Sequence, residues 1–403
     1  MKLFEFEGKS LFKQYEIKIP EGIVVSEMVE IGGAKISYPV MIKAQLLSGK
    51  RGKRGLIKKV EKESELKAII EGWLGLKVNG EEIKSVLVER VVDVVQELFV
   101  SITYSTRTRS PLLLVAKGGI EVESQASVVE MPLKVGMEIP PIKLEGETLE
   151  TEDEKDKELL EAKIWKVVQS LWTLFQEKDL FLAEINPLVV TSSNQVIALD
   201  AKVVTDDAAE FRQKWELPER NMLGRDKSWA EIEAEKIDAQ DHRGVVGRVY
   251  LDLEGDIGVI AAGGGASLVA MDALVGFGLK PANYTEFSGN PPKGKVKRLT
   301  EIVLAKKRLK GAILVGGKAN FTDQVETLSG FLEALHEIVP DYPIVVRRDG
   351  PGMNEAKEML EKAALENNWK IKVFDASVPI VESVRILVDM VAEKGKTFGK
   401  KIR

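Results

Sequence analysis

Residues 183–202 place two short apolar runs on either side of a polar turn, which predicts a β-hairpin. If the turn has three residues and ends in Asn194 with a left-handed backbone, Asn186 lies opposite Asp200 and both side chains leave the same face. A four-residue turn would pair Asn186 with Ala201 instead. One amide and one carboxylate suit Mg²⁺ that arrives on a nucleotide, because Mg²⁺ keeps water and phosphate as its other ligands. The alternative is an ordinary hairpin with Asn and Asp near its ends.

The composition restricts the class of protein. The chain has 403 residues, 44% hydrophobic and 30% charged, which is enough for two or three domains with separate cores. A net charge of -5 argues against a nucleic-acid-binding protein, whose domain would be strongly basic. Without cysteine, the sequence excludes disulfides, thiolate metal sites and cysteine nucleophiles. The N-terminal MKLFEFEGK lacks the apolar core of a signal peptide, and residues 257–271 are too short and glycine-rich for a membrane span, so a cytoplasmic location is predicted.

A glycine-rich basic loop follows an early predicted strand. The apolar run at 40–42 delivers Lys43, and the loop SGKRGKRG carries Lys50, Arg51 and Gly52. Glycine lets the backbone approach a phosphate closely, while cationic side chains supply charge-assisted donors. The pattern favours a polyphosphate site, and the alternative is a solvated basic turn.

Two carboxylates lie on the strands that follow. Residues 86–92 and 97–104 read as strands and carry Glu89 and Glu97. A carboxylate at a strand end beside a nucleotide can accept hydrogen bonds from ribose hydroxyls or from an adenine amino group. The alternative is an exposed charge.

The first half ends with a long helix expected at 152–178, opened by a capping box of Thr151 and Glu154, and then the hairpin. Residues 1–205 therefore predict an α+β domain with an antiparallel sheet. A charged, polar stretch at 206–246 indicates a helical connector.

From 247 to 395 strands and helices alternate, which predicts a parallel, doubly wound α/β domain of flavodoxin-like or Rossmann-like type. Strands are expected at 257–261, 312–315, 344–347 and 371–374. Residues 396–403 are a basic tail that is expected to fray.

Three glycine-containing loops follow these strands: GGGAS, GGKANFT and RRDGPG. Ligands of doubly wound sheets collect at the carboxyl ends of the strands. GGKANFT ends at a predicted helix, so its free amides and the positive helix end are expected to face a ligand. With Arg347 and Arg348 and the hydroxyl of Ser288, the loops favour a pocket for a small polycarboxylate or a phosphoryl group. The alternative is that the glycines only form tight turns.

These motifs resemble those of the nucleoside-diphosphate-forming acyl-CoA synthetases, and among them the ATP-citrate lyases and citryl-CoA synthetases. The first half is similar to the ATP-grasp half of a succinate-CoA ligase β subunit through LFEFEGKSLFKQY, SGKRGKRG, QELFVSITYS, AEINPLVV and ALDAK. The resemblance implies that Asn186 and Asp200 hold Mg²⁺ and that Glu184 has a catalytic role. It implies that ATP is bound by Lys43, Lys50, Arg51 and Glu97, with Gly52 and Glu89 beside them. The sequence departs from the family at Lys117, where a glutamate usually precedes the paired glycines.

In the second half, AAGGGAS, ANYTEFSGNPP, VGGKANFTD and VVRRDGP resemble the citrate-binding domain of ATP-citrate lyase. Succinate-specific relatives carry a GGI loop and lack the paired arginines. The resemblance implies that citrate is bound by Ser288, Gly289, Asn320, Thr322 and Arg348. A trianion needs more donors than a dianion, which fits the extra side chains.

The chain has two histidines, His242 in the charged connector and His336 beside the apolar stripe of a predicted helix. In the family, ATP phosphorylates a histidine, the phosphoryl group passes to citrate, and CoA displaces it to give citryl-CoA. The resemblance therefore implies a hetero-oligomer in which a partner subunit carries that histidine and the CoA-binding domain. One alternative is the β subunit of a succinate- or other acyl-CoA ligase. Another is a non-catalytic nucleotide-binding partner, in which Lys117 reflects lost chemistry.

Overall fold

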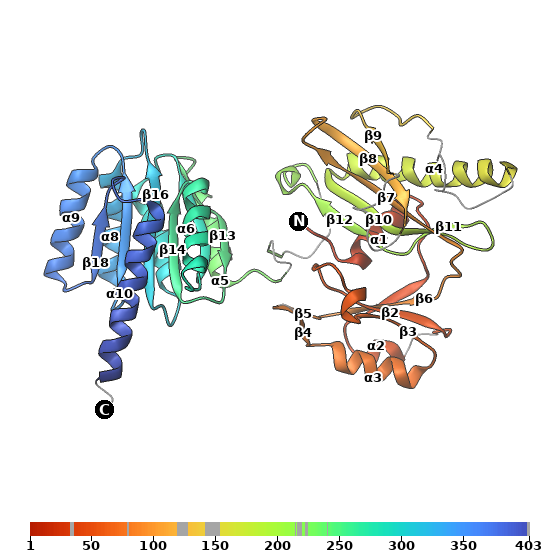
Figure 1. The fold of residues 1–403 in the computed structure, drawn as a ribbon, viewed down its shortest axis with the longest axis horizontal. Helices are drawn as coiled ribbons and strands as arrows, with labels where there is room; N and C mark the ends of the chain where they lie inside the picture. The colour runs from red at the N-terminus through yellow and green to blue at the C-terminus, as the bar shows by residue number, and fades with distance from the viewer. Residues whose placement is uncertain are drawn as a thin grey trace. The chain divides into compact units, whose positions relative to one another are not determined.

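The computed structural model describes residues 1–32, 36–78, 80–118, 128–141, 154–213, 215, 220–221, 225–239 and 241–400. The chain divides into two compact units, Met1–Arg225 and Asp226–Arg403 (Figure 1). The division falls inside the stretch expected to be a connector. No helix of the described ranges is long and apolar enough to cross a membrane. The predicted cap residue Thr151 lies outside these ranges.

The first unit begins with α1 (Glu5–Gln14) and contains a four-stranded antiparallel sheet in the order β1-β6-β2-β3. Its strands are β1 (Gly22–Val25), β6 (Val86–Arg90), β2 (Val40–Ala44) and β3 (Ile57–Val60). α3 (Glu63–Trp73) turns Leu66, Ile70 and Trp73 toward this sheet, because residues three and four apart share one helix face. The short elements α2 (Val29–Gly32), β4 (Lys77–Val78) and β5 (Glu81–Glu82) complete this part.

The second sheet of this unit is antiparallel, in the order β11-β10-β7-β8-β9, with β12 also pairing with β10. Its strands are β7 (Gln96–Ser105), β8 (Ser110–Lys117), β9 (Val129–Pro132), β10 (Leu180–Val190), β11 (Val196–Ala198) and β12 (Lys202–Thr205). The long helix α4 (Glu154–Glu177) covers one face and buries Leu160, Ile164, Leu171 and Leu174 against it. The expected α+β domain is confirmed.

The second unit has one six-stranded sheet in the order β13-β15-β14-β16-β17-β18. Its strands are β13 (Val245–Asp252), β14 (Ile257–Ala262), β15 (Asn283–Ser288), β16 (Gly311–Lys318), β17 (Ile344–Asp349) and β18 (Ile371–Phe374). β14 pairs in parallel with β15 on one side and with β16 on the other, and β17 and β18 continue the parallel sheet beyond β16. The strand order therefore runs outward from β14 in both directions, as in flavodoxin-like sheets. The topological switch therefore lies between β14 and β16.

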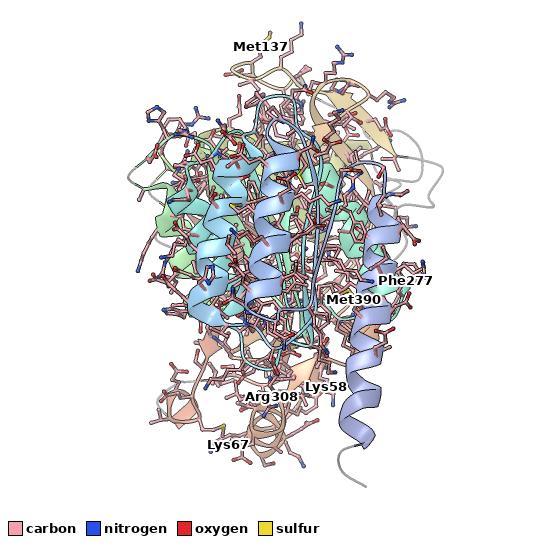
Figure 2. The ribbon with its side chains drawn as sticks, turned by 90° about the vertical axis from the view of Figure 1, so that its left-hand side faces the viewer. Lys58, Lys67, Met137, Phe277, Arg308 and Met390 are labelled. Carbon is pink, nitrogen blue, oxygen red and sulfur yellow. The ribbon has the colours of Figure 1, made fainter. Side chains whose placement is uncertain are left out.

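Helices cover both faces of this sheet (Figure 1). One face packs against α5 (Trp229–Glu235), α7 (Lys293–Leu304), α8 (Gln324–Ile338) and α9 (Met353–Glu366). The other packs against α6 (Gly264–Gly276) and α10 (Ile380–Lys400), where Met390 contacts the core (Figure 2). Neighbouring residues of β16 serve opposite faces, Leu314 one and Val315 the other, which explains why this strand is apolar throughout.

Three features of this unit differ from the sequence-based expectation. The sheet is mixed, because β13 pairs with β15 in the antiparallel direction. β15 and α7 were not predicted, since NYTEFS alternates polar and apolar residues only weakly and α7 opens with KGKVKR. The tail expected to fray from residue 396 is helical up to Lys400, as the last turns of α10.

Candidate functional site

The hairpin has the register that pairs the position of Asn186 with that of Asp200. β10 pairs with β11 at Leu188↔Ala198 and with β12 at Glu184↔Lys202, so equal numbers of residues separate the two pairs on both sides. Asn194 has φ 55° and closes the three-residue turn by donating its backbone N–H to the Thr191 carbonyl at 2.9 Å. The predicted three-residue turn is confirmed, and Asn186 and Asp200 occupy opposite positions.

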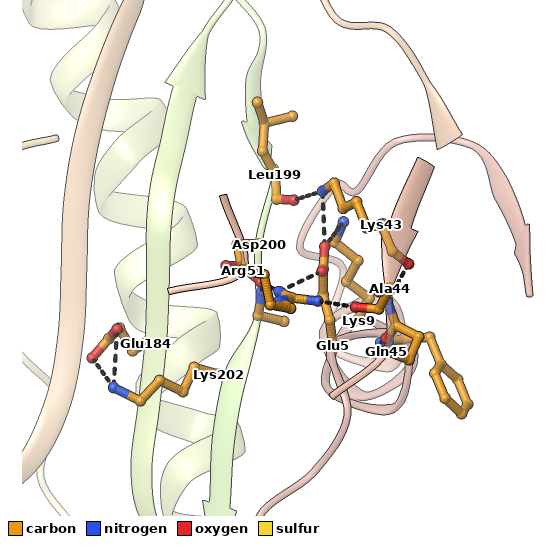
Figure 3. A network of polar contacts seen from close by, with 12 residues as sticks. Glu5, Lys9, Lys43, Ala44, Gln45, Arg51, Glu184, Leu199, Asp200 and Lys202 are labelled. Atoms are coloured by element: carbon orange, nitrogen blue, oxygen red, sulfur yellow. Dashed lines mark hydrogen bonds and ion pairs between the residues drawn. The ribbon is translucent and has the colours of Figure 1, made fainter. Parts of the chain in front are cut away.

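A cluster of charged side chains lies against this hairpin (Figure 3). Lys43 Nζ, from β2, lies 2.8 Å from Oε1 of Glu5 and 2.9 Å from Oε2 of Glu89, and it donates to the Leu199 carbonyl at 2.6 Å. Arg51 Nη2 lies 2.7 Å from Oε2 of Glu5 and 3.1 Å from Oδ1 of Asp200. The predicted residues Lys43, Arg51 and Asp200 are thus brought together from three separate segments.

Two buried residues of α1 belong to the same cluster although the sequence did not single them out. Glu5 and Lys9 are one helical turn apart, with Nζ 2.7 Å from Oε1, and both are almost fully buried. Lys9 also contacts Oε1 of Glu89 at 2.6 Å. The four-residue spacing of Glu5 and Lys9 in the sequence indicates a helical ion pair. Nothing in the sequence indicated that Lys43, Arg51 and Glu89 would contact this pair.

The pKa values in the cluster follow from burial and from neighbouring charges. Burial raises the pKa of Glu5, but Lys43, Lys9 and Arg51 outweigh it, so the pKa lies well below its ordinary value. For Lys43, burial lowers the pKa, but Glu5 and Glu89 raise it above the ordinary value. Burial and the negative charge of Glu5 raise the pKa of Asp200. A divalent cation beside Asp200 would counter this shift and favour its ionised form.

The hairpin residues fit a magnesium ion in chemical type. Asn186 and Asp200 are half-buried and offer hard amide and carboxylate oxygens. Oδ1 of Asp200 accepts hydrogen bonds from Arg51 and, at 2.8 Å, from the Ala201 N–H. Within the described ranges no three His, Asp or Glu residues form a metal site by themselves. The donor set therefore suits a cation that brings phosphate ligands with it.

The other residues predicted for the nucleotide have different surroundings. Lys50 is exposed with φ 64°, and Gly52 opens a short 3₁₀ turn. Glu97 is exposed on β7, and its carbonyl accepts the Gly118 N–H at 2.7 Å. For Glu89 the sequence left a nucleotide contact or an exposed charge open. Glu89 is buried near the end of β6, and both its oxygens contact ammonium groups.

Glu184, predicted to be catalytic, lies on β10 apart from the charged cluster (Figure 3). Its carboxylate contacts Lys202 of the neighbouring strand at 3.3 Å. Lys117, the departure from the family pattern, is an exposed residue at the end of β8. Gly118 follows it, and a Cβ there would lie 2.7 Å from Glu97, so the close approach of these two backbones requires glycine.

A second candidate site lies at the carboxyl ends of the parallel strands in the second unit. A cavity of about 200 Å³ opens at the switch between β14 and β16, where doubly wound sheets bind ligands. It is lined by all five residues predicted to contact a polycarboxylate: Ser288, Gly289, Asn320, Thr322 and Arg348. Lys318 and the exposed ring of Phe321 also line it.

Arg348 is the buried cation of this cavity. Its Nε donates to Oε1 of Gln324 at 3.0 Å, and its guanidinium lies 5.6 Å from the ring centre of Phe287. Burial and the charge of Arg347 lower the pKa of Arg348 to about 10, so it stays cationic at neutral pH. Gly316 makes room for it, because a Cβ at this position would lie 1.9 Å from Nη1.

Two expectations about this pocket are wrong. Arg347 does not share it: its guanidinium donates to the backbone carbonyls of Gly316, Ala376 and Val378, because adjacent strand residues point to opposite faces. The first amides of α8 do not face a ligand either. The Asp323 side chain accepts from the N–H groups of Val325 and Glu326, and the Gln324 N–H donates to a carbonyl of the neighbouring loop.

Neither histidine lines the cavity. His242 and His336 are both exposed, and the ring of His336 lies 5.0 Å from that of Trp369. Gln324 and Gly316 are further residues that the sequence did not single out. Gln324 is fully buried, and its amide also donates to the Thr322 carbonyl at 2.9 Å, so it ties Thr322 to Arg348.

Comparison with known proteins supports both halves of this description. A family model of the ATP-grasp domain matches residues 2–190, and one described as ATP citrate lyase citrate-binding matches residues 225–390. A solved ATP citrate lyase from Methanothrix soehngenii, in complex with citrate and coenzyme A, has a TM-score of 0.73 at 23% identity. That alignment covers 96% of this chain and 99% of the other, and it shows a shared fold.

The fold and the ATP-grasp match define a ligase-type enzyme of the ATP-grasp superfamily. The ATP-grasp fold implies the use of ATP and Mg²⁺. The chain is 31% identical to the β subunit of the ADP-forming succinate–CoA ligase of Rubrobacter xylanophilus over 401 residues, 96% of this chain and 99% of that protein. The Bacillus licheniformis subunit of the same name is 31% identical over 402 residues, 96% of this chain and 100% of that protein. The chain belongs to this family of succinate–CoA ligase β subunits, with a second domain of citrate-binding type.

Proposed function

We propose that this chain is one subunit of an ATP-dependent citrate-activating enzyme. It binds Mg-ATP and citrate, and a partner subunit with a phosphorylatable histidine and a CoA site completes the synthesis of citryl-CoA. The observation that carries the proposal is the cavity at the switch between β14 and β16. It collects a buried guanidinium, two hydroxyls and an amide from the residues predicted for citrate. The citrate-binding family model over residues 225–390 supports the same assignment.

The side chains of this cavity suit a tricarboxylate. Arg348 offers a charge-assisted donor whose orientation is held by Gln324, and Lys318 adds a second cation at the rim. Asn320 and Ser288 contribute neutral donors. Thr322 Oγ1 donates to the Gly289 carbonyl at 2.5 Å, which joins the loops after β15 and β16 into one wall of the pocket.

In the first unit, Lys43 and Arg51 would contact the polyphosphate, and Asn186 and Asp200 would hold the Mg²⁺ that accompanies it. Bound ATP supplies the phosphoryl group. The chain's own residues would hold that nucleotide, and the partner's histidine would accept the group, because neither His242 nor His336 lines the cavity to which the group would pass.

A second candidate function is that of a succinate–CoA ligase β subunit. The 31% identity over nearly the whole length of relatives with that name favours it. ADP formation by the chain reconstituted with its partner subunit, with CoA and either citrate or succinate, separates the two. We expect citrate to support turnover at least tenfold better than succinate. Preference for succinate would overturn the citrate assignment while leaving the ATP-grasp role intact.

Calorimetric titration of the purified chain adds a partner-independent measurement. We expect citrate to bind without nucleotide, and Arg348→Ala to abolish measurable binding at the same concentrations. Equal binding of citrate by the variant and by the original chain would remove the cavity from the proposal.

A further inference from the structure

Glu5 occupies an unusual position in the charged cluster of the first unit. It lies in the first turn of α1 and is 3% exposed, and its carboxylate contacts three cations. Oε1 contacts Lys9 and Lys43, and Oε2 contacts Arg51. Glu5 is therefore the carboxylate that joins Lys43 of β2 to Arg51 of the glycine-rich loop. Asp200 contacts Arg51, and Glu89 contacts the two lysines.

Stability alone is a weak reason for such an arrangement. Removing several charges from water costs free energy that their mutual attraction often only balances, and apolar replacements of buried ion pairs are frequently neutral or stabilising. The cluster is also balanced, with Glu5, Glu89 and Asp200 against Lys9, Lys43 and Arg51. Its members converge on the Leu199 and Asp200 edge of the hairpin, where Lys43 donates to the Leu199 carbonyl.

We propose that Glu5 is a positioning residue for nucleotide binding. Its two oxygens hold the ammonium of Lys43 and the guanidinium of Arg51 side by side at the hairpin edge, so that both present donors to the same polyphosphate. Lys9 balances the charge of the carboxylates through its contacts with Glu5 and Glu89. This inference rests on the proposed function only in taking Mg-ATP as the ligand of the first unit. It does not depend on whether the carboxylic acid that the enzyme activates is citrate or succinate.

The sign of the effect separates positioning from simple electrostatics. Glu5→Gln removes one negative charge close to three cations, two of which are Lys43 and Arg51. If Lys43 and Arg51 stayed in place, the more positive site would bind the anionic nucleotide more tightly. If Glu5 positions them, the loss of two charge-assisted contacts lets both side chains turn away, and Mg-ATP affinity falls by about 10- to 100-fold.

Glu7 supplies a matched control on the same helix. It is also buried, its Oε1 forms an ion pair with Arg220, and its Oε2 accepts the Phe4 N–H at 2.8 Å. Glu7→Gln therefore removes a buried, ion-paired carboxylate and weakens the same helix end, but it touches neither Lys43 nor Arg51. We expect it to lower thermal stability without changing Mg-ATP affinity.

The test is calorimetric titration of the purified full chain and its variants with Mg-ATP and, separately, with citrate, after circular dichroism confirms that each is folded. Glu5→Gln should weaken Mg-ATP binding and leave citrate binding unchanged, and Glu5→Asp, which keeps the charge, should recover part of the affinity. Unchanged or tighter Mg-ATP binding by folded Glu5→Gln overturns the proposal, as does an equal loss in Glu7→Gln.

If Glu5→Gln does not fold, the Glu5→Asp variant decides. Its shortened side chain cannot reach both Lys43 and Arg51, so it must weaken Mg-ATP binding if the proposal is right. A chain that binds Mg-ATP but no citrate would contradict the proposed function and leave the role of Glu5 testable.

Discussion

Replacing Gly316 by alanine tests whether Arg348 must lie across β16 to bind citrate. The added Cβ would lie 1.9 Å from Nη1 of Arg348, whereas contacts below 3.0 Å are essentially never observed. The guanidinium of Arg348 would therefore have to move by at least about 1 Å. A shift of this size breaks a hydrogen bond of ordinary length between the guanidinium and bound citrate. The backbone of Gly316 lies outside the left-handed region, so alanine adds no conformational strain there.

The expected magnitude follows from the contact that is lost. A hydrogen bond to a charged group contributes about 1.5–3 kcal/mol, so displacement of Arg348 should weaken citrate binding by about 10- to 150-fold. Mg-ATP binding should not change, because Gly316 belongs to the second unit and the nucleotide residues to the first. Calorimetric titration with both ligands measures this difference directly.

Two controls identify the cause. Gly294→Ala changes a glycine of α7 whose added Cβ meets nothing within 4 Å, so it should leave citrate binding unchanged and raise stability by at most about 1 kcal/mol. The Cβ of Gly316→Ala would also lie 2.9 Å from that of Ala262, so its unfolding temperature is measured separately. A folded Gly316→Ala chain that binds citrate normally would refute the reasoning.

Three further predictions concern single groups. Asp200→Asn should leave the fold intact and weaken Mg-ATP binding at least tenfold, because the cation loses its charged protein ligand. Calorimetric titration with ATP in the presence of Mg²⁺ measures this loss, and unchanged affinity would show that Asp200 is not a ligand. The pKa of Glu5 lies below its ordinary value of 4.5, so this carboxylate stabilises the fold above about pH 4.5 and the contribution is lost as the pH falls further. Urea unfolding from pH 6 to pH 3 should therefore show a shallower loss of stability in Glu5→Gln, and parallel curves would contradict this. The chain with His242→Gln and His336→Gln should keep its activity with the partner subunit, and acid-labile label from γ-labelled ATP on either histidine of the isolated chain would show otherwise.

Some parts of the fold and site were accessible from sequence because they depend on neighbouring residues. The hairpin is one of them: its turn length and the left-handed Asn194 set the register, and the register places Asn186 opposite Asp200. Asn320, Thr322 and Arg348 were also predictable, because they lie at or just after the ends of the expected strands β16 and β17 and the carboxyl ends of such strands meet at one edge. Ser288 and Gly289 lie at the end of β15, a strand that was not predicted. The unbroken apolar run of β16 likewise indicates a strand buried on both faces.

Other features depended on contacts between segments far apart in the chain. The sequence showed Arg347 and Arg348 as an equivalent pair, but only the packed sheet decided which of them faces the cavity and which donates to backbone carbonyls. From the sequence Glu89 could be a nucleotide contact or an exposed charge, and only the packing of α1, which brings Lys9 to it, shows a buried ion pair. The sequence by itself determined the two domain types, because local periodicity sets them, and it limited the hairpin turn to three or four residues. Most candidate ligands came from the family resemblance. Tertiary structure alone decided which charges pair, since a buried charge takes the partner that folding brings within about 3 Å of it.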